Sequence, residues 1–213
     1  VAYVNGLSIV FEGGGIESDG QGTLLTTDSV VVEPNRNAGV DEEVLRTHLM
    51  EILGGKRLLS LENGELEGDD TDGHIDTLAR FLTPEMIAYV GCDDERDSHY
   101  HALRRMREEL QNFRTLEDKP YQLVELPLPP AIYDEEGERL PATYANFLFV
   151  NGALLVPTYG VPSDEVALER LRKALPELAV VGVDSRALIY QHGSLHCATM
   201  QFPKGFINKN KWN

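Results

Sequence analysis

The 213-residue chain has few cysteines, few basic residues and no long apolar run, and each shortage argues against a class of protein. Its two cysteines, Cys92 and Cys197, lie far apart, which argues against a disulfide-held extracellular scaffold, so both thiols are expected to be reduced. No apolar stretch reaches the roughly 18 to 20 residues of a membrane span, and the first residues lack the order of a secretory signal. We therefore expect a cytoplasmic protein with no membrane partner.

Acidic residues outnumber basic ones by 35 to 19, which gives the chain a formal net charge of −16. Such a charge argues against nucleic acid and anionic membranes as partners, and it is compatible with a small cationic one. An acidic surface also serves solubility alone, so the charge does not identify a ligand. The chain begins at Val1 rather than at methionine, and we expect a fragment or a processed product.

A strand–strand–helix–strand pattern recurs along the chain at a spacing of about 65 to 70 residues. Its three units cover about 7–62, 74–126 and 143–184, and a hairpin over 187–202 resembles the opening of another unit. In the first unit, apolar residues predict a hairpin of strands 7–11 and 22–32. The acids of Asp41-Glu42-Glu43 then predict the start of a helix, which Gly54-Gly55 ends before a strand over 57–61.

The same signals return in the next two units. The expected elements of the second unit are a hairpin of 75–82 and 86–90, a helix over 98–116 and a strand over 121–126. Those of the third unit are a hairpin of 144–150 and 153–157 around Asn151-Gly152, a helix over 164–175 and a strand over 178–183. Such repeats usually bury their faces against one another, so we expect an α/β fold with one continuous core.

Four residues supply the parts of a nucleophilic site. Cys197 brings a thiol, and His74 and Asp76 bring an imidazole and a carboxylate spaced as His-x-Asp. Glu12 adds a second carboxylate, followed by three glycines that let other backbone approach closely. Each residue also has a structural interpretation, because a lone cysteine is often a buried packing residue and a carboxylate often caps a turn.

These residues fall at related places in the repeat. We expect Glu12 at the end of the first strand of unit one, His74 and Asp76 at the first strand of unit two, and Asn146 in the first strand of unit three. Equivalent positions of a radial repeat converge on its axis, so these side chains and Cys197 are predicted to meet in a central cleft. Asp69, Asp70 and Asp72, just before His74, serve either solvation or the reading of a cationic substrate tail.

Several motifs, in this order and spacing, resemble the agmatine deiminase and bacterial-type peptidylarginine deiminase family of guanidine-modifying enzymes. The matching stretches are Glu12-Gly13-Gly14, Gly20-Gln21-Gly22-Thr23-Leu24-Leu25-Thr26-Thr27, Asn35-Arg36-Asn37, Gly73-His74-Ile75-Asp76, Tyr144-Ala145-Asn146-Phe147, Asn151-Gly152 and the His196-Cys197 loop. The resemblance covers residues from about Ser8 to Gln201. It implies a pentein-type α/β propeller of five ββαβ blades, of which about three are present in this chain.

The resemblance implies hydrolysis of a guanidinium to a ureido group with release of ammonia, a hydrolase reaction on the C–N bond of a linear amidine. Cys197 would attack as thiolate and form a covalent thiouronium, while His74 would protonate the ammonia and then activate water. Asp76 would bind the guanidinium, Glu12 would hold His74, and Asn146 would be a polar contact in the pocket. No metal or organic cofactor is implied. Agmatine, converted to N-carbamoylputrescine in polyamine biosynthesis, is the expected substrate.

The chain departs from the family pattern in one respect. Members carry well over a hundred further residues upstream, in which an Arg-Asp motif supplies another acid for the guanidinium, and that blade is missing here. The chain is therefore expected to be a truncated propeller, inactive or very weak alone, whose open sheet edges favour homo-oligomers. Peptidylarginine or arginine deimination, amidino transfer to an amine, and a non-catalytic interaction module are the alternatives.

Overall fold

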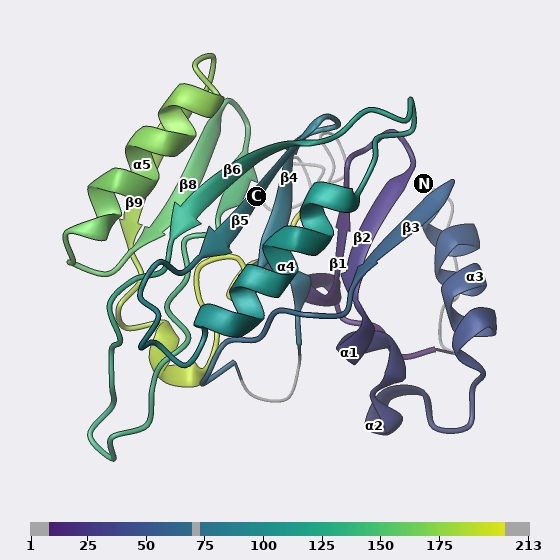
Figure 1. Cartoon of the computed structure of the whole chain (residues 1–213), viewed down its shortest axis with the longest axis horizontal. Helices are drawn as coiled ribbons and strands as arrows, with labels where there is room; N and C mark the ends of the chain where they lie inside the picture. The colour runs from purple at the N-terminus through teal and green to yellow at the C-terminus, as the bar shows by residue number, and fades with distance from the viewer. Residues whose placement is uncertain (1–8, 70–72, 203–213) are drawn as a thin grey trace, which may run out of the picture.

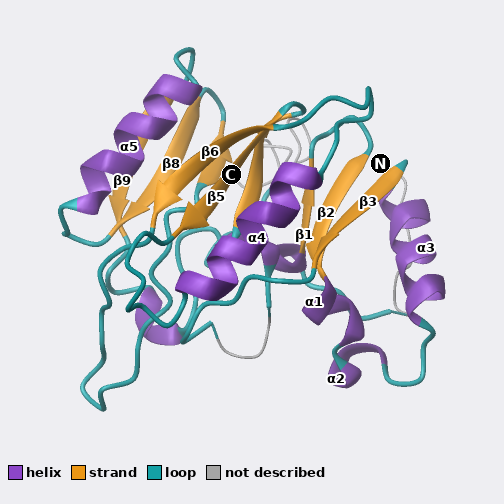
Figure 2. Cartoon of the chain, viewed as in Figure 1, coloured by secondary structure: helices purple, strands orange, loops and turns teal. Residues whose placement is uncertain are grey.

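Three small β-sheets lie side by side in the computed structural model, which describes residues 9–69 and 73–202 (Figure 1). In each sheet the first strand is antiparallel to the second, and the second is parallel to the third. A helical segment links the second and third strands of every sheet, because a parallel pair needs a long crossover (Figure 2). The described part of the chain therefore has a mixed α/β fold of repeated ββαβ units.

The elements follow the predicted order. The first unit contains β1 (Ile16–Ser18), β2 (Thr23–Thr27), α1 (Asp28–Val32), α2 (Pro34–Asn37), α3 (Glu42–Leu53) and β3 (Arg57–Leu61). The second contains β4 (Ala79–Thr83), β5 (Met86–Gly91), α4 (Tyr100–Asn112) and β6 (Gln122–Pro127). The third contains β7 (Leu148–Val150), β8 (Ala153–Thr158), α5 (Ser163–Ala174) and β9 (Ala179–Asp184). Within the described ranges, no helix combines the length and the apolar character needed to cross a bilayer.

Local signals place the ends of α3 where the sequence predicts them. A side-chain oxygen of Asp41 accepts hydrogen bonds from the backbone N–H groups of Glu43 and Val44, which would otherwise lack partners at the helix start. Gly54 ends the helix in the left-handed conformation at φ 68°, and its N–H donates to the carbonyl of Met50. The helix predicted after Asp41 is confirmed, with both caps.

The hydrophobic core lies mainly between units. Helix α5 packs on β6 of the preceding unit as well as on its own β9, and α4 packs on β3 as well as on β5. One apolar cluster accordingly joins the second and third units, and another joins the first and second. By contrast, α3 buries only Leu45 and Leu49, in a small cluster of the first unit. Because α4 and α5 each fill the space between two sheets, neighbouring units hold each other at fixed positions.

The first predicted hairpin is shifted along the chain. Residues 1–8 lie outside the described part, and residues 9–11 form no strand; the first strand is β1, Ile16–Ser18. The second strand stops at Thr27 because its ladder partner β3 ends at Leu61, opposite Thr27. Beyond that point Thr27 accepts a hydrogen bond from the N–H of Val30 and caps helix α1, so residues 28–32, which include three β-branched valines, are helical rather than extended.

The hairpin predicted over 187–202 does not form. Residues 189–191 make a 3₁₀ turn, and the rest of the segment is irregular up to residue 202. The N–H groups of Gln191 and His192 donate to carbonyls three residues back, and the N–H groups of His196 and Cys197 donate to Asn146. Because these N–H groups already have acceptors, the two halves of the segment do not form backbone hydrogen bonds with each other as paired strands.

Candidate active site

The predicted site residues lie just before the first strand of each unit. Glu12 precedes a 3₁₀ turn that leads into β1, and Asp76 lies in the corresponding 3₁₀ turn before β4. Asn146 lies two residues before β7. The expectation that these residues end or enter the strands is therefore wrong by about one turn. The repeat relation itself holds, and the turns of the first two units contact each other.

A cavity of about 650 Å³ brings the candidates from the first and second units together with the C-terminal loop. Its lining includes Glu12, His74, Asp76 and Cys197, four of the five residues singled out in the sequence. Other lining residues are Gly13, Gly14, Ile16, Glu17, Ser18, Arg80, Phe149, His196, Thr199, Met200 and Gln201. The convergence expected from the repeat is thus present in the geometry, at the junction of segments distant in sequence.

Asn146, the fifth candidate, lies beneath the nucleophile loop and is fully buried. Its amide oxygen accepts the N–H groups of His196 at 2.7 Å and of Cys197 at 3.3 Å. Its amide nitrogen lies 3.2 Å from the sulfur of Cys197 and 3.3 Å from the backbone carbonyl of Asp76. The side chain therefore fixes the loop that carries the thiol against the turn that carries the carboxylate.

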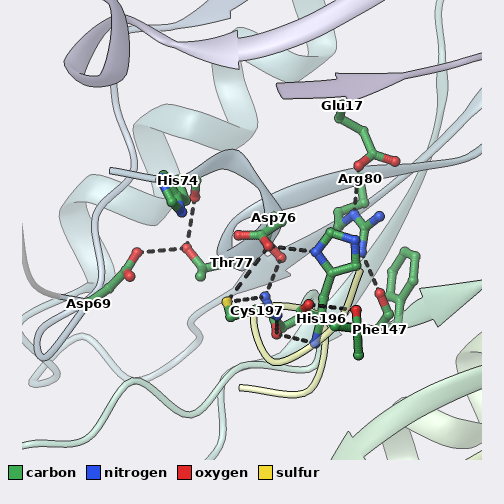
Figure 3. A network of polar contacts seen from close by, with 11 residues as sticks. Glu17, Asp69, His74, Asp76, Thr77, Arg80, Phe147, His196 and Cys197 are labelled. Carbon is green, nitrogen blue, oxygen red and sulfur yellow. Dashed lines mark hydrogen bonds and ion pairs between the residues drawn. The ribbon is translucent and has the colours of Figure 1, made fainter. Parts of the chain in front are cut away.

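Asp76 pairs with a histidine that the sequence interpretation did not assign to the site. Its Oδ2 lies 2.6 Å from Nδ1 of His196 and 3.7 Å from the sulfur of Cys197, as Figure 3 shows. The other oxygen, Oδ1, is buried and has no hydrogen-bond partner among the described residues. The position of His196 next to Cys197 was the signal available in the sequence, but nothing there indicated contact with a residue 120 positions away.

His74 faces Glu12 rather than Asp76, although the His-x-Asp motif places it two residues from the latter. Its Nε2 lies 3.7 Å from Oε2 of Glu12, which is ion-pair distance but too long for a hydrogen bond. Arg36 takes both oxygens of Glu12 through its Nε, at 3.0 and 2.7 Å. Burial opposes the charge of Glu12, but the Arg36 hydrogen bonds prevail and hold its pKa below the usual value.

Gly14 is the reason that the two turns can approach each other. A Cβ atom at this position would lie 2.6 Å from Nδ1 of His74 and 3.1 Å from Oδ2 of Asp76. The first distance is shorter than real Cβ contacts allow, so a side chain here would displace the imidazole or the carboxylate. Gly14, the middle glycine of the run after Glu12, thus has a steric function at the site.

The thiol of Cys197 is held in its protonated form in this arrangement. Cys197 as a whole is exposed, yet its sulfur lies against Asn146 and Asp76. Desolvation of the sulfur, followed by repulsion from the Asp76 carboxylate, raises the pKa of Cys197 to about 11. A cation bound beside the sulfur would act in the opposite direction and favour the thiolate.

The acid-rich loop before His74 is only partly described. Asp70 and Asp72 lie outside the described residues, so the prediction that they read a substrate tail is untested. A carboxylate oxygen of Asp69 accepts a hydrogen bond from the hydroxyl of Thr77 at 2.9 Å. In the described ranges, no three His, Cys, Asp or Glu side chains are grouped in a way that could hold a metal ion.

The comparisons with known proteins agree on one family. A family model described as Porphyromonas-type peptidyl-arginine deiminase matches residues 1–203. A curated protein of Marinomonas sp., named as a candidate agmatine deiminase, is 33% identical over 95% of this chain. A solved structure of a candidate arginine deiminase from Porphyromonas gingivalis is 54% identical over 95% of this chain, with a TM-score of 0.92. A variant of C. jejuni agmatine deiminase with substrate bound is 47% identical over 87% of this chain, with a TM-score of 0.82.

This chain is shorter than the proteins that it matches. It spans 59% of the Marinomonas protein, 59% of the Porphyromonas gingivalis chain and 54% of the C. jejuni chain. Over the shared part, the family model covers nearly all of the sequence and the solved structures share the fold. The chain therefore belongs to the Porphyromonas-type peptidyl-arginine deiminase family.

Proposed function

We propose that this chain is the cysteine-bearing part of a hydrolase that converts a guanidino group to a ureido group, with agmatine as the leading substrate. The observation that carries the proposal is the convergence of Cys197, Asp76, His74 and Glu12 on one cavity. These are the residue types that nucleophilic hydrolysis of a cationic amidine requires. The name of the similar C. jejuni protein, an agmatine deiminase, supports this substrate class.

Binding would use the open oxygen of Asp76. Because Oδ2 already accepts from His196, Oδ1 is the acceptor left for a guanidinium N–H. A charge-assisted hydrogen bond there would relieve the cost of a buried acceptor without a partner. The guanidinium carbon would then lie near the sulfur of Cys197, which is 3.7 Å from the same carboxylate.

The chemistry would proceed in two halves. The bound cation lowers the pKa of Cys197, the sulfur loses its proton to solvent and attacks the guanidinium carbon, and a C–S bond forms. His74 protonates the departing nitrogen, the C–N bond breaks, and ammonia is released. A covalent thiouronium remains on the sulfur of Cys197. Water, deprotonated by His74, then adds to the carbon, and the C–S bond breaks to give the ureido product and the free thiol. The sum is one guanidinium and one water to one urea and one ammonium.

Glu12 would hold His74 in position. Its carboxylate is kept ionised by Arg36 and lies at ion-pair distance from the imidazole of His74. In this interpretation Arg36 sets the position of Glu12, a role that the sequence pattern alone did not assign.

We further propose that the active protein contains additional ββαβ units that close a five-unit propeller around this cavity. Within the described residues, each of β3 and β6 is covered by the helix of the following unit, whereas β9 has no such helix and leaves Val181 exposed. A preceding unit would cover α3 in the same way, on which Val44 is 60% exposed. The second guanidinium-binding acid would come from these units, so the 213-residue chain alone is expected to be inactive or weak.

The test is turnover by the full-length protein that contains this chain. Agmatine, free arginine and a peptidylarginine are incubated separately, and the ureido product is quantified. Agmatine is expected to turn over fastest, the Cys197→Ala variant to lose at least about 10³-fold in rate, and Cys92→Ala to stay near wild type. If the wild type turns over no guanidino compound, or Cys197→Ala matches it, the deiminase proposal fails.

Peptidylarginine deimination is the second candidate, because the matching family model carries that description. The same panel separates the two, since a peptidylarginine enzyme would prefer the peptide over agmatine. The same experiment identifies two other functions. An amidinotransferase would consume the guanidino substrate without forming ureido product when an amine is supplied. A non-catalytic interaction module would consume no substrate.

A further inference from the structure

His196 stands beside the nucleophile and contacts the carboxylate proposed to bind the substrate. Its imidazole is 16% exposed, lines the active-site cavity and points at Asp76, as Figure 3 shows. Its neighbour in sequence supplies the thiol, and both residues are held by the amide oxygen of Asn146. The loop therefore delivers a sulfur and an imidazole to the same carboxylate.

The hydrogen bond defines which nitrogen of His196 carries a proton. A carboxylate offers only acceptors, so Nδ1 must donate to Oδ2 of Asp76 across the 2.6 Å contact. Such a bond fixes the rotation of the carboxylate, which is itself only 1% exposed. With Oδ2 held, the remaining oxygen Oδ1 has a defined position relative to the sulfur of Cys197.

We propose that His196 is a positioning residue that orients Asp76 for recognition of a cationic amidine or guanidine at Cys197. The inference rests on the proposed function, because it assumes that Asp76 binds the cation. Without His196, the only described side chain left within hydrogen-bond distance of the Asp76 carboxylate would be the thiol of Cys197. The carboxylate could then rotate, and Oδ1 would no longer have a defined position. Preference for a charged ligand over a neutral one would fall, since that preference depends on where the negative charge lies.

A purely structural histidine would act differently. If His196 only stabilised the loop, its loss would change the reactivity of Cys197 toward charged and neutral reagents alike, or lower thermal stability. The discriminating quantity is therefore the ratio of two alkylation rates at one sulfur, which loop loosening leaves unchanged.

The full-length protein that contains this chain is alkylated with 2-chloroacetamidine, which is cationic, and in a separate sample with 2-chloroacetamide, its neutral counterpart. Mass spectrometry follows labelling of Cys197, with Cys92 in the same sample as the reference thiol. In the wild type, the cationic-to-neutral rate ratio at Cys197 is expected to exceed that at Cys92. His196→Ala should lower the Cys197 ratio about tenfold, the size expected for losing a hydrogen bond to a charged group.

Two further variants keep the proposal falsifiable. His196→Asn places an amide N–H near the position of Nδ1 and should restore most of the ratio. His192→Ala is the matched control, because His192 lies on the same segment, is exposed, and its side chain is described in one hydrogen bond, to the carbonyl of Gly68. It should leave the ratio unchanged.

The outcomes separate the inference from the function on which it rests. If the wild type prefers the amidine and His196→Ala keeps that preference, or if His196→Asn is no better than His196→Ala, the positioning role is wrong while the cation site stands. If the wild type has no preference beyond that of Cys92, the cation site fails and the positioning role fails with it.

Discussion

Among the described residues, two aspartate–histidine pairs each have one buried member, His99 in one and Asp76 in the other, and only the first pair has all its acceptors used. His99 lies 2.7 Å from Asp97 through Nδ1, and its Nε2 accepts the backbone N–H of Glu67 at 2.8 Å. Both oxygens of Asp97 also accept from Arg139, at 3.0 and 2.9 Å. In the other pair, His196 lies 2.6 Å from Asp76, whose Oδ1 has no partner within the described residues.

The difference shows how similar pairs of side chains serve different purposes. The Asp97 pair joins the start of α4 to two loops, and every one of its strong acceptors is used, so there is no place for a ligand. The Asp76 pair lines a cavity beside a thiol and keeps one acceptor unused. A buried polar group that lacks a partner costs stability, and such costs concentrate at functional sites.

Asp76→Asn should have the largest effect in this comparison. In the full-length protein we expect kcat/KM for agmatine to fall at least about 10²-fold, because the neutral amide cannot balance the guanidinium charge. Steady-state kinetics measure this directly. Asp97→Asn is the matched control, and its kcat/KM per folded molecule should be near wild type; equal losses in the two variants would contradict the division between the pairs.

Asp97→Asn should instead weaken the fold. It removes the ion pair with Arg139 and one partner of His99, so the free energy of unfolding should fall by about 2 to 3 kcal/mol. Urea unfolding of the full-length protein measures the change. Asp76→Asn should cost less than half as much, because its Oδ1 has no hydrogen bond to lose. A larger loss for Asp76→Asn would show that the site pair is structural as well.

The thiol of Cys197 should respond to Asp76 and not to Asp97. Repulsion from the Asp76 carboxylate is the second cause, after burial, of the raised pKa near 11. Removing that charge in Asp76→Asn should lower the pKa by about one pH unit and speed alkylation by neutral chloroacetamide about tenfold at pH 8. Asp97→Asn should leave the rate at Cys197 unchanged. An unchanged rate in Asp76→Asn would mean that burial alone holds the thiol protonated.

Acid should remove the advantage that Asp97 gives to the wild type. Burial opposes the charge of Asp97, but hydrogen bonds from Arg139 and His99 outweigh it and hold its pKa well below the usual range. A carboxyl group with a lowered folded-state pKa stabilises the fold above its unfolded value of about 4 and loses that contribution as the pH falls further. The stability gap between wild type and Asp97→Asn should therefore shrink by about 1 kcal/mol from pH 6 to pH 3, as urea unfolding would show. A constant gap would contradict this assignment.

Much of the fold could be read from local patterns. The helix capped by Asp41, the turn at Asn151-Gly152 and the third strand of each unit depend on signals within a few residues, and the structure confirms them. The wrong secondary-structure predictions concern segments whose conformation depends on a contact with a distant part of the chain. The run 28–32 resembles a strand but has no strand opposite it. The segment 187–202 resembles a hairpin, but the N–H groups of His196 and Cys197 donate to Asn146 instead.

The same distinction between local and long-range information applies to the candidate site. The residue types, their order and the repeat that places Glu12, His74, Asp76 and Cys197 near one another follow from the amino-acid sequence alone. The pairing follows from how the units pack: Asp76 contacts His196 rather than His74, and Glu12 contacts both Arg36 and His74. The reason is physical, because periodicity fixes which face of an element a residue occupies, whereas hydrogen bonds a few ångströms long depend on how separate units pack against one another.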